Sequence, residues 1–432
     1  MTGSAGMPGL ARVLARRGIH FGWVVAGVTF LTMLATAAAM GMPGVLMVPL
    51  EQEFGWSAAQ ISGALALRLL LYGVMGPFSA ALLARFGLRA TVAAALGLIV
   101  AGLGLATQIT ALWELWLCWG VLVGFGTGMT AMVLGAYVAN RWFVRRRGLV
   151  MGLLTASAAT GQLVFLPAAA WLAQHIGWRW AMLPAVGACA AACLLMLIFG
   201  ADHPADVDLP AYGEAGVVAR TRPGNPVRTA LDTFAEASRN RVFWILFGTF
   251  FICGLSTNGL IQTHFIPLCH DFGIPEVQAA SVLAAMGMFD FIGTIGSGWL
   301  SDRYDSRWLL AWYYGLRGLS LLFLPSSSFT FYGLSLFAVF YGLDWIATVP
   351  PTVKLAAGAF GRERAAVVFG WVFMGHQLGA AVAAYGGGLS RSELSSYLPA
   401  FYTAGVFCLI AAAAALWARP RRAARLRSAL AG

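Results

Sequence analysis

Long uncharged apolar segments recur along the whole chain, and each is about as long as the roughly 20 residues that a helix needs to cross a bilayer. Of the 432 residues, 59% are hydrophobic and 10% are charged, whereas a soluble protein carries roughly 25% charged residues. Lipid must therefore surround most of the chain. Lipid offers backbone groups no hydrogen-bond partner, so each crossing segment must be a helix. We expect an all-α membrane protein with twelve transmembrane helices in two six-helix bundles, at residues 21–49, 58–83, 90–111, 114–139, 148–173, 178–200, 242–267, 276–300, 308–325, 329–353, 365–388 and 397–418.

The formal net charge of +11 reflects topology. Of the 28 basic residues, 24 fall in the N-terminus, the even-numbered loops and the C-terminal tail, while two fall on the opposite side and two inside predicted spans. Cytoplasmic loops are enriched in Lys and Arg, so the sequence predicts that both termini are cytoplasmic. The excess of Arg over Lys is a compositional sign of a bacterial source, which makes this an inner-membrane protein. No nucleic-acid partner is implied.

Nothing in the sequence indicates an enzyme. There is no nucleophile–base pair, metal-ligand cluster or phosphate-binding glycine loop. The six cysteines are scattered along apolar segments without the paired spacing of a metal site or a disulfide framework. We therefore expect no cofactor and no metal.

The twelve segments form a tandem repeat. Segment 54–60, FGWSAAQ, resembles segment 272–278, FGIPEVQ, at an offset of 218 residues. The same offset relates Arg85 to Arg303, Arg89 to Arg307, Gly152 to Gly370 and Gly161 to Gly379. Because each copy holds an even number of helices, both copies have the same orientation in the membrane. We expect an N-terminal bundle at residues 1–200, and a C-terminal bundle with its cytoplasmic tail at 242–432.

Residues 201–241 lie between the two copies. They mix charges with Pro and Gly and show no apolar periodicity, which is typical of a linker. We expect a flexible cytoplasmic connection that lets the two bundles move against each other.

The loop after the eighth segment carries the sequence Gly298-Trp299-Leu300-Ser301-Asp302-Arg303, followed by Arg307. It resembles the Gly-x-x-x-Asp-Arg signature of the major facilitator superfamily, and the resemblance covers essentially the whole chain. In that family the Asp lies at a helix N-terminus beside an Arg and latches the two bundles on the cytoplasmic side, which implies a cytoplasmic gate at Gly298, Asp302, Arg303 and Arg307. In the first copy Ala80 and Ala84 replace the Gly and the Asp, while Arg85 and Arg89 remain as gate candidates.

Two further motifs resemble the monocarboxylate and oxalate/formate porter branch of this superfamily. They are Asn140-Arg141-Trp142-Phe143, followed by Arg145-Arg146-Arg147-Gly148, and the glycine run from Gly124 to Gly128. One feature departs from the pattern. Many proton-coupled members have an Arg on the fourth helix where this chain has Gly120, so coupling through that position is not expected.

Five ionisable residues lie at membrane depth, away from the ends of the predicted spans: Arg68, Asp290, Arg317, Asp344 and His376. Such residues cost free energy in lipid and usually mark a functional site. In the family, helices 1, 2, 4, 5, 7, 8, 10 and 11 face a central cavity. The resemblance therefore implies that all of these residues except Arg317 can reach it.

Each of these residues has a functional and a structural interpretation. Arg68 either clamps a substrate anion, because a guanidinium binds a carboxylate bidentately, or forms a standing ion pair with Asp290 or Asp344. Arg317 is better read as a brace that pairs with Asp344 or with helix carbonyls.

Asp290, Asp344 and His376 are candidate proton carriers, and the alternative is that they are hydrogen-bonded packing groups. Asn258 and Gln262 lie four residues apart on one helix face, as substrate contacts together with His376 or as polar contacts between helices.

The sequence thus predicts a secondary transporter that moves a small organic anion, such as a monocarboxylate, by alternating access with a proton as the coupling ion. The expected partners are that substrate, the proton and the lipid bilayer. Two alternatives are an exporter of apolar or cationic compounds, in which Asp290 and Asp344 attract the cation, and a membrane sensor that transports nothing.

Overall fold

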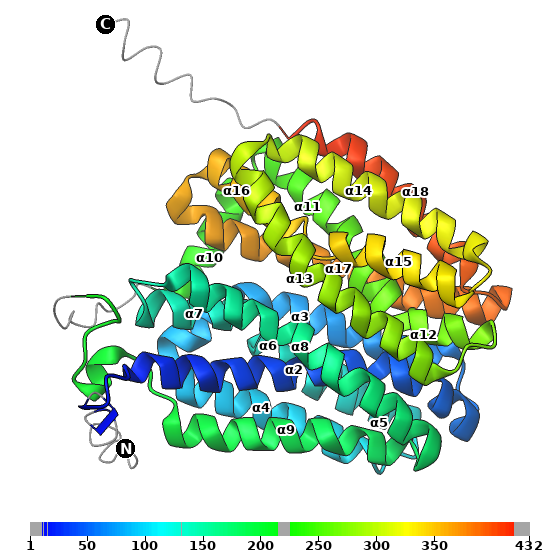
Figure 1. Ribbon diagram of the computed structural model, residues 1–432, viewed down its shortest axis with the longest axis horizontal. Helices are drawn as coiled ribbons and strands as arrows, with labels where there is room; N and C mark the ends of the chain where they lie inside the picture. The colour runs from blue at the N-terminus through cyan, green and yellow to red at the C-terminus, as the bar shows by residue number, and fades with distance from the viewer. Residues whose placement is uncertain (1–10, 12, 15, 131, 215–224, 419–432) are drawn as a thin grey trace, which may run out of the picture.

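The computed structural model describes residues 11–418 except 12, 15, 131 and 215–224, and the described part is almost entirely helical (Figure 1). Ten helical stretches in this part are long and apolar enough to cross a membrane. They correspond to α2 (Phe21–Phe54), α3 (Ala58–Phe86), α4 (Leu88–Ala106), α5 to α7 (Leu112–Trp142), α9 (Trp178–Phe199), α11 to α12 (Arg241–Asp271), α13 (Glu276–Arg303), α15 to α16 (Phe331–Phe360), α17 (Arg362–Leu394) and α18 (Leu398–Ala415).

The other two predicted spans coincide with α8 (Arg147–His175) and α14 (Ser306–Phe323). Helix α8 packs against α2 and α13, and α14 packs against α18. Each predicted segment therefore coincides with helical residues, and the all-α class is confirmed.

The turn between the first two long helices recurs one repeat later. Helix α2 is followed by Gly55 at φ 68°, and α12 (Gln262–Asp271) is followed two residues later by Gly273 at φ 77°. This left-handed conformation is easily adopted only by glycine. Ser57 then caps α3, since its Oγ accepts a hydrogen bond from Gln60 N at 3.3 Å. The predicted offset of 218 residues thus relates two turns of the same shape.

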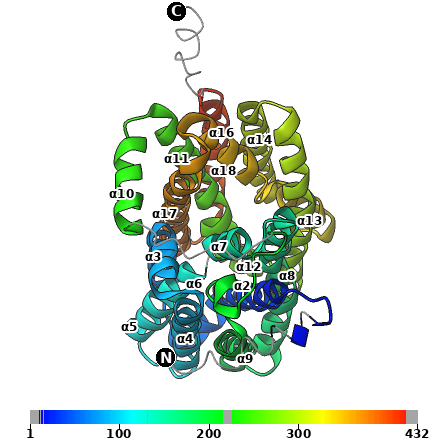
Figure 2. The same cartoon turned by 90° about the vertical axis from the view of Figure 1, so that its left-hand side faces the viewer.

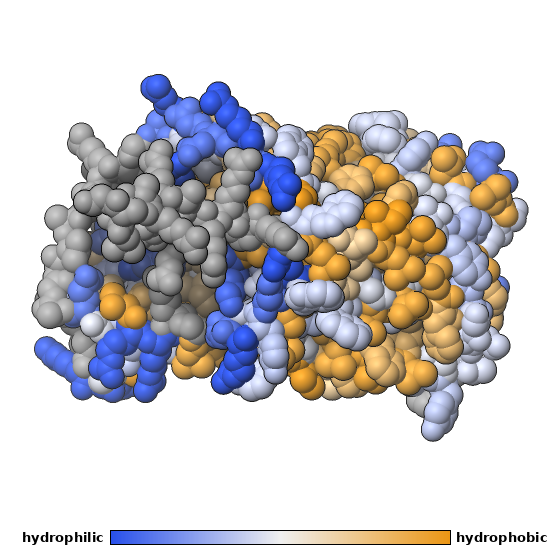
Figure 3. Space-filling view, turned by 90° about the horizontal axis from the view of Figure 1, so that it is seen from above, coloured by the Kyte–Doolittle hydropathy of each residue, from blue (hydrophilic) through white to orange (hydrophobic). Residues whose placement is uncertain are grey.

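Helices α2 to α9 occupy the lower half of Figure 1, and α11 to α18 occupy the upper half. The two groups meet along their length, where α3 packs against α17 and α8 against α13. In Figure 3 hydrophilic residues gather at the end of the molecule where the described chain begins and ends, and an apolar band covers much of the rest of that face. We call the loops that join α3 to α4, α7 to α8 and α13 to α14, with Arg89, Arg145 and Arg303 in or next to them, the basic end.

The first part of the linker contacts the N-terminal helices. Tyr212 forms an isolated parallel bridge with Phe143, and its carbonyl accepts hydrogen bonds from Val144 N and Arg145 N at 3.0 Å. His20 Nε2 lies 3.0 Å from the carbonyl oxygen of Pro210. Aromatic and backbone contacts therefore hold residues 201–213 on the N-terminal helices, and the flexibility of the linker stays a prediction.

The second part of the linker contains α10 (Pro226–Ala237), which packs against both α3 and α17 (Figure 2). Trp371 Nε1 donates a hydrogen bond to Ala230 O at 3.0 Å, and its ring lies 4.6 Å from that of Phe234. Helix α10 thus covers the Trp371 ring, and the ring in turn covers the apolar face of α10. The sequence did not indicate this helix, because its apolar face is short.

Two membrane segments are interrupted near their centres. The fourth consists of α5 (Leu112–Leu115), the π-helical turn η1 (Trp116–Val123), α6 (Gly124–Met129) and, after Thr130, α7 (Met132–Trp142). The tenth consists of α15 (Phe331–Asp344) and α16 (Val349–Phe360), separated by turn residues 345–348. The two interruptions lie at corresponding positions of the repeat, and both border the cavity described next.

Candidate functional site

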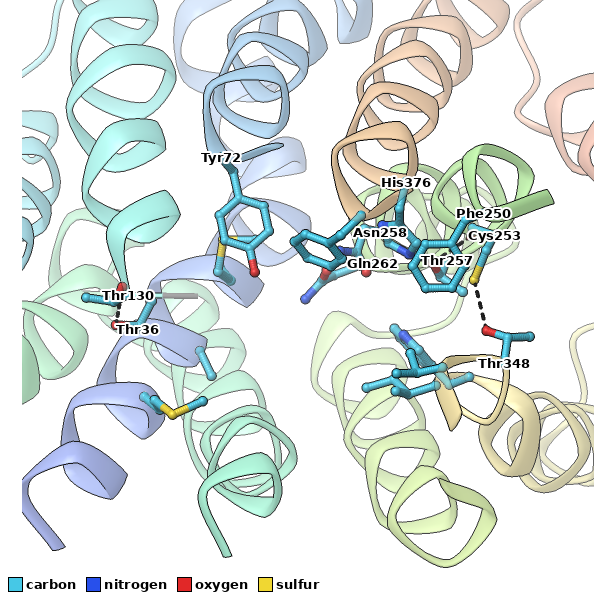
Figure 4. Close-up of a pocket in the computed structure, with 17 residues that line it drawn as sticks. Thr36, Tyr72, Thr130, Phe250, Cys253, Thr257, Asn258, Gln262, Thr348 and His376 are labelled. Atoms are coloured by element: carbon cyan, nitrogen blue, oxygen red, sulfur yellow. Dashed lines mark hydrogen bonds between the residues drawn. The ribbon is translucent and has the colours of Figure 1, made fainter. Parts of the chain in front are cut away.

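A cavity of about 160 Å³ lies between the two groups of helices (Figure 4). A single water needs roughly 10–15 Å³ of such space, so the cavity has room for a small organic molecule. Its lining comes from α2, α3 and the interrupted fourth segment on one side, and from the seventh, tenth and eleventh segments on the other. The lining residues are Met33, Thr36, Ala37, Met40, Tyr72, Thr130, Phe250, Cys253, Thr257, Asn258, Gln262, Trp345, Ile346, Thr348, Val349, Phe373 and His376.

The seventh membrane segment, which contains the π-helical turn η3 (Leu255–Ile261), contributes the polar lining residues Thr257, Asn258 and Gln262. The other polar lining residues are Thr36, Tyr72, Thr130, Thr348 and His376. Asn258 and Gln262 lie next to each other in Figure 4, as their spacing predicts. π-Helical turns inside an α-helix often occur at functional sites. Three of the four predicted substrate contacts, Asn258, Gln262 and His376, therefore line one cavity.

His376 is held by aromatic rings. It stacks on Phe373 with a centroid separation of 5.5 Å, and Phe250 lies 5.1 Å away on another helix. Its Nε2 lies 3.4 Å from Thr257 Oγ1, whereas its Nδ1 is buried and has no hydrogen-bond partner. The imidazole is thus fixed at the cavity wall, and its Nδ1 is a buried nitrogen without a hydrogen-bond partner.

Arg68 is not among the lining residues. It is buried on α3, and its Nη1 donates hydrogen bonds to Ala39 O at 3.4 Å and Met40 O at 3.2 Å. None of the ion pairs among the described residues includes Arg68. The role of Arg68 as an anion clamp stays a prediction, and in this conformation its guanidinium is bound to the carbonyls of α2.

Arg317 pairs with Asp344, as the brace interpretation predicts. Its Nε lies 2.8 Å from Asp344 Oδ2, and its Nη2 donates to the carbonyl oxygens of Asp344 at 2.5 Å and Trp345 at 3.0 Å. Its Nη1 lies 2.9 Å from Cys253 Sγ. Arg317 therefore satisfies carbonyls that the end of α15 leaves without helical partners.

Asp290 binds the same interruption from α13. Its Oδ1 accepts hydrogen bonds from Ile346 N at 2.7 Å and from Thr294 Oγ1 at 3.1 Å. Ser297, two helical turns further along α13, donates to Ala347 O at 2.5 Å. Because Pro351 has no N–H, Ala347 O would otherwise lack a helical donor. Neither Asp290 nor Asp344 lines the cavity, so their predicted role in proton coupling would be exerted from behind its wall.

At the basic end the anion beside the ninth segment is Asp305. Its Oδ1 accepts from Arg307 N at 2.9 Å, and its Oδ2 lies 2.6 Å from Arg307 Nη2. These contacts hold the pKa of the Asp305 carboxyl below its usual value. Asp302 is exposed, and Arg303 lies over the Trp299 ring at 4.0 Å. A Cβ on Gly298 would meet nothing within 4 Å, so no close contact there requires glycine. The latch stays a prediction, and Asp305 is a further candidate residue for it.

In the first copy the corresponding carboxylate comes from the linker. Asp202 Oδ1 accepts a hydrogen bond from Arg89 N at 3.0 Å, at the start of α4. A Cβ on Gly87 would lie 2.2 Å from Asp202 Oδ2, so glycine is needed there. Arg85 lies over the adjacent Phe86 ring at 5.4 Å. The sequence alone does not reveal this contact, because Asp202 lies more than 100 residues away in the chain from the start of α4, which it caps.

The family model of the Major Facilitator Superfamily matches residues 29–384 and 265–431. The chain belongs to the major facilitator superfamily. It is therefore a membrane transport protein rather than an enzyme, and its relatives support the predicted resemblance to the monocarboxylate branch. It is 26% identical over 385 residues to the uncharacterized MFS-type transporter YcxA of Bacillus subtilis, covering 87% of this chain and 90% of that protein. It is 27% identical over 399 residues to monocarboxylate transporter 13 of Bos taurus, covering 90% and 87% of the two chains.

Two solved structures share the fold. A bacterial homologue of the human lysosomal transporter Spinster, in an inward-facing and unoccupied conformation, matches with a TM-score of 0.70 and 16% identity, covering 92% of this chain and 97% of that one. A variant of the nucleoside transporter NupG matches with a TM-score of 0.71 and 13% identity, covering 91% and 99%. These likenesses concern the fold alone.

Proposed function

We propose that the protein moves a small organic acid, of the monocarboxylate type, together with a proton across a bacterial inner membrane. The observation that carries this proposal is the small cavity in which polar groups, among them Asn258, Gln262 and His376, lie beside apolar side chains of both halves. An acid with a short apolar chain matches both kinds of wall. The monocarboxylate transporters among the relatives support the same class of substrate.

The transport cycle is alternating access, in which the N-terminal and C-terminal bundles rock about this cavity. We propose the boundaries 1–200 and 242–432 for the two bundles, with both termini and the basic end in the cytoplasm. Moving one charge against 100 mV costs about 2.3 kcal/mol. Carrying a proton with a monoanion removes this term, so electroneutral transport follows the pH gradient.

The alternative of an exporter of cations has less support. It requires Asp290 and Asp344 to face the substrate. Asp290 instead accepts hydrogen bonds from Ile346 N and Thr294, Asp344 pairs with Arg317, and neither carboxylate lines the cavity. The predictions that Arg68 holds the anion and that Asp290 or His376 takes the proton remain open to test.

A thermal-shift screen of the purified protein against small carboxylates and small organic cations tests the proposal. A ligand that binds the folded state stabilises it by RT ln(1 + [L]/Kd). We expect carboxylates of three to five carbons to raise the unfolding temperature, and Asn258→Leu to abolish the shift. Stabilisation by cations alone would contradict the proposal.

A further inference from the structure

The walls of the cavity carry no formal charge. None of its described lining residues is Lys, Arg, Asp or Glu, and the titratable ones are Tyr72 on α3, Cys253 on α11 and His376 on α17. The charged groups behind these walls have partners of their own: Arg68 bonds to the carbonyls of α2, Asp290 to Ile346 N, and Arg317 to Asp344. Arg68 is in no ion pair, but it lies behind the wall, so a bound carboxylate would meet no cation among the described lining residues.

Burying a carboxylate without a cation costs several kcal/mol. Protonating the substrate first costs less. An alkyl carboxyl of pKa about 4.3 is protonated in roughly one molecule in 500 at pH 7, which converts to about 3.7 kcal/mol at 1.36 kcal/mol per pKa unit. In a cavity with neutral walls the neutral acid is the cheaper form to bind.

The polar groups also match a neutral acid. The side-chain amides of Asn258 and Gln262 each present an N–H donor and a carbonyl acceptor. A protonated carboxyl group has the complementary set, an O–H donor and a C=O acceptor. A carboxylate has acceptors only, so it would leave the amide carbonyls facing a negative charge.

Building on the proposed function, we propose that the cavity binds its organic acid in the neutral, protonated form, so that the transported proton travels on the substrate's own carboxyl group. No proton carrier on the protein is then required. Coupling is automatic, because the anion alone does not fit the neutral site.

Calorimetric titration of the purified full-length protein with butyrate and with butyramide tests this inference without a membrane that the acid could cross by itself. The Kd for total butyrate should rise about 100-fold from pH 6 to pH 8, as the protonated fraction falls. Butyramide, an uncharged analogue, should bind with the same Kd at both pH values. A pH-independent Kd for butyrate, with no binding of butyramide, would overturn the inference while leaving the proposed function intact.

Variants separate a proton on the substrate from a proton on the protein. Asp290→Asn and His376→Gln should keep the 100-fold pH dependence, whereas Asn258→Leu should weaken the binding of butyrate and butyramide alike. Gln52→Leu, at an exposed position of α2, is the matched control and should change neither. Loss of the pH dependence in Asp290→Asn would place the proton on Asp290 and overturn the inference. If the wild type binds neither butyrate nor any carboxylate of the screen, the proposed function fails as well.

Discussion

The two halves of the chain stabilise corresponding interruptions in different ways. In the C-terminal half the end of α15 is held by the buried pair of Arg317 and Asp344. The residues 218 positions earlier are Ile99 and Gly126, and they pack directly: a Cβ on Gly126 would lie 2.6 Å from Ile99 Cγ1. One half therefore uses an ion pair where the other uses a close contact between a helix backbone and an apolar side chain.

A similar difference is found at the cavity wall. Asp290 and Tyr72 correspond in the repeat, yet Tyr72 lines the cavity while Asp290 binds Ile346 N behind it. At this position the N-terminal half thus places a neutral side chain on the cavity surface, whereas the C-terminal half uses a carboxylate to hold the backbone behind the wall. A charged side chain at membrane depth can therefore form hydrogen bonds with the backbone of a neighbouring helix instead of contacting a ligand.

The largest effect should come from breaking the ion pair on one side. Arg317→Met leaves the Asp344 carboxylate buried without its partner, which typically costs about 3–5 kcal/mol. We expect a large fall in the thermal unfolding temperature in detergent, or loss of the folded protein. The double variant Arg317→Ile with Asp344→Gly copies the first half and should recover most of the stability. If the double variant is no more stable than the single one, the close contact of the first half cannot replace the ion pair of the second.

Filling the close contact of the first half should have a smaller effect. Gly126→Ala would place its Cβ 2.6 Å from both Ala95 O and Ile99 Cγ1, and overpacking of this kind costs roughly 1–3 kcal/mol. Gly97→Ala on α4, where a Cβ meets nothing within 4 Å, is the control and should be neutral or slightly stabilising. Equal unfolding temperatures for the two variants would show that α6 does not depend on this contact.

At Asp290 the outcome should depend on whether a hydrogen-bond acceptor remains. Asp290→Leu leaves Ile346 N without its partner, which costs about 1–3 kcal/mol, and should weaken substrate binding because Ile346 lines the cavity. Asp290→Asn keeps a carbonyl oxygen at this position and should be close to wild type in stability. Unfolding curves and Kd values of the two variants, measured side by side, check this. Equal losses in both would show that the charge itself is required.

The smallest effect is expected at the helix caps of the basic end. Asp305→Ala and Asp202→Ala each remove a carboxylate from a helix N-terminus, which costs about 1 kcal/mol. Because the pKa of Asp305 is lowered in the folded protein, its contribution is present above the usual pKa of an Asp and is lost as the pH falls below it. The Asp305→Ala deficit in unfolding temperature should therefore shrink in acid. A deficit that grows in acid would contradict the capping role.

The architecture could be predicted from the sequence because lipid dictates it. Each apolar segment had to become a helix, and the repeat offset related the two copies before any contact was known. The brace at Arg317 was also predictable, because a buried guanidinium on an outer helix needs a partner. The capping of α4 by Asp202 was not, since the two lie far apart in the chain.

The interruption of the tenth segment explains most of the differences at the site. Because the helix is interrupted there, Ile346 N is free to donate to Asp290, which does not reach the cavity. The sequence feature that indicates the interruption is the pair Pro350-Pro351, because proline cannot donate a hydrogen bond to the preceding turn. Which side chains face the cavity depends on the rotation of each helix about its axis. Hydrophobic periodicity does not show this rotation in helices that are apolar on all sides, and so Tyr72 was not recognised as a lining residue.

Uptake into proteoliposomes under an imposed pH gradient tests the central claim most directly. With the outside acidic, the account predicts accumulation of a small monocarboxylate that is absent from protein-free liposomes, is lost in Asn258→Leu, is abolished by a protonophore and is unchanged when a membrane potential is imposed or collapsed. No uptake above the protein-free control, or uptake that follows the membrane potential instead of the pH gradient, would contradict it.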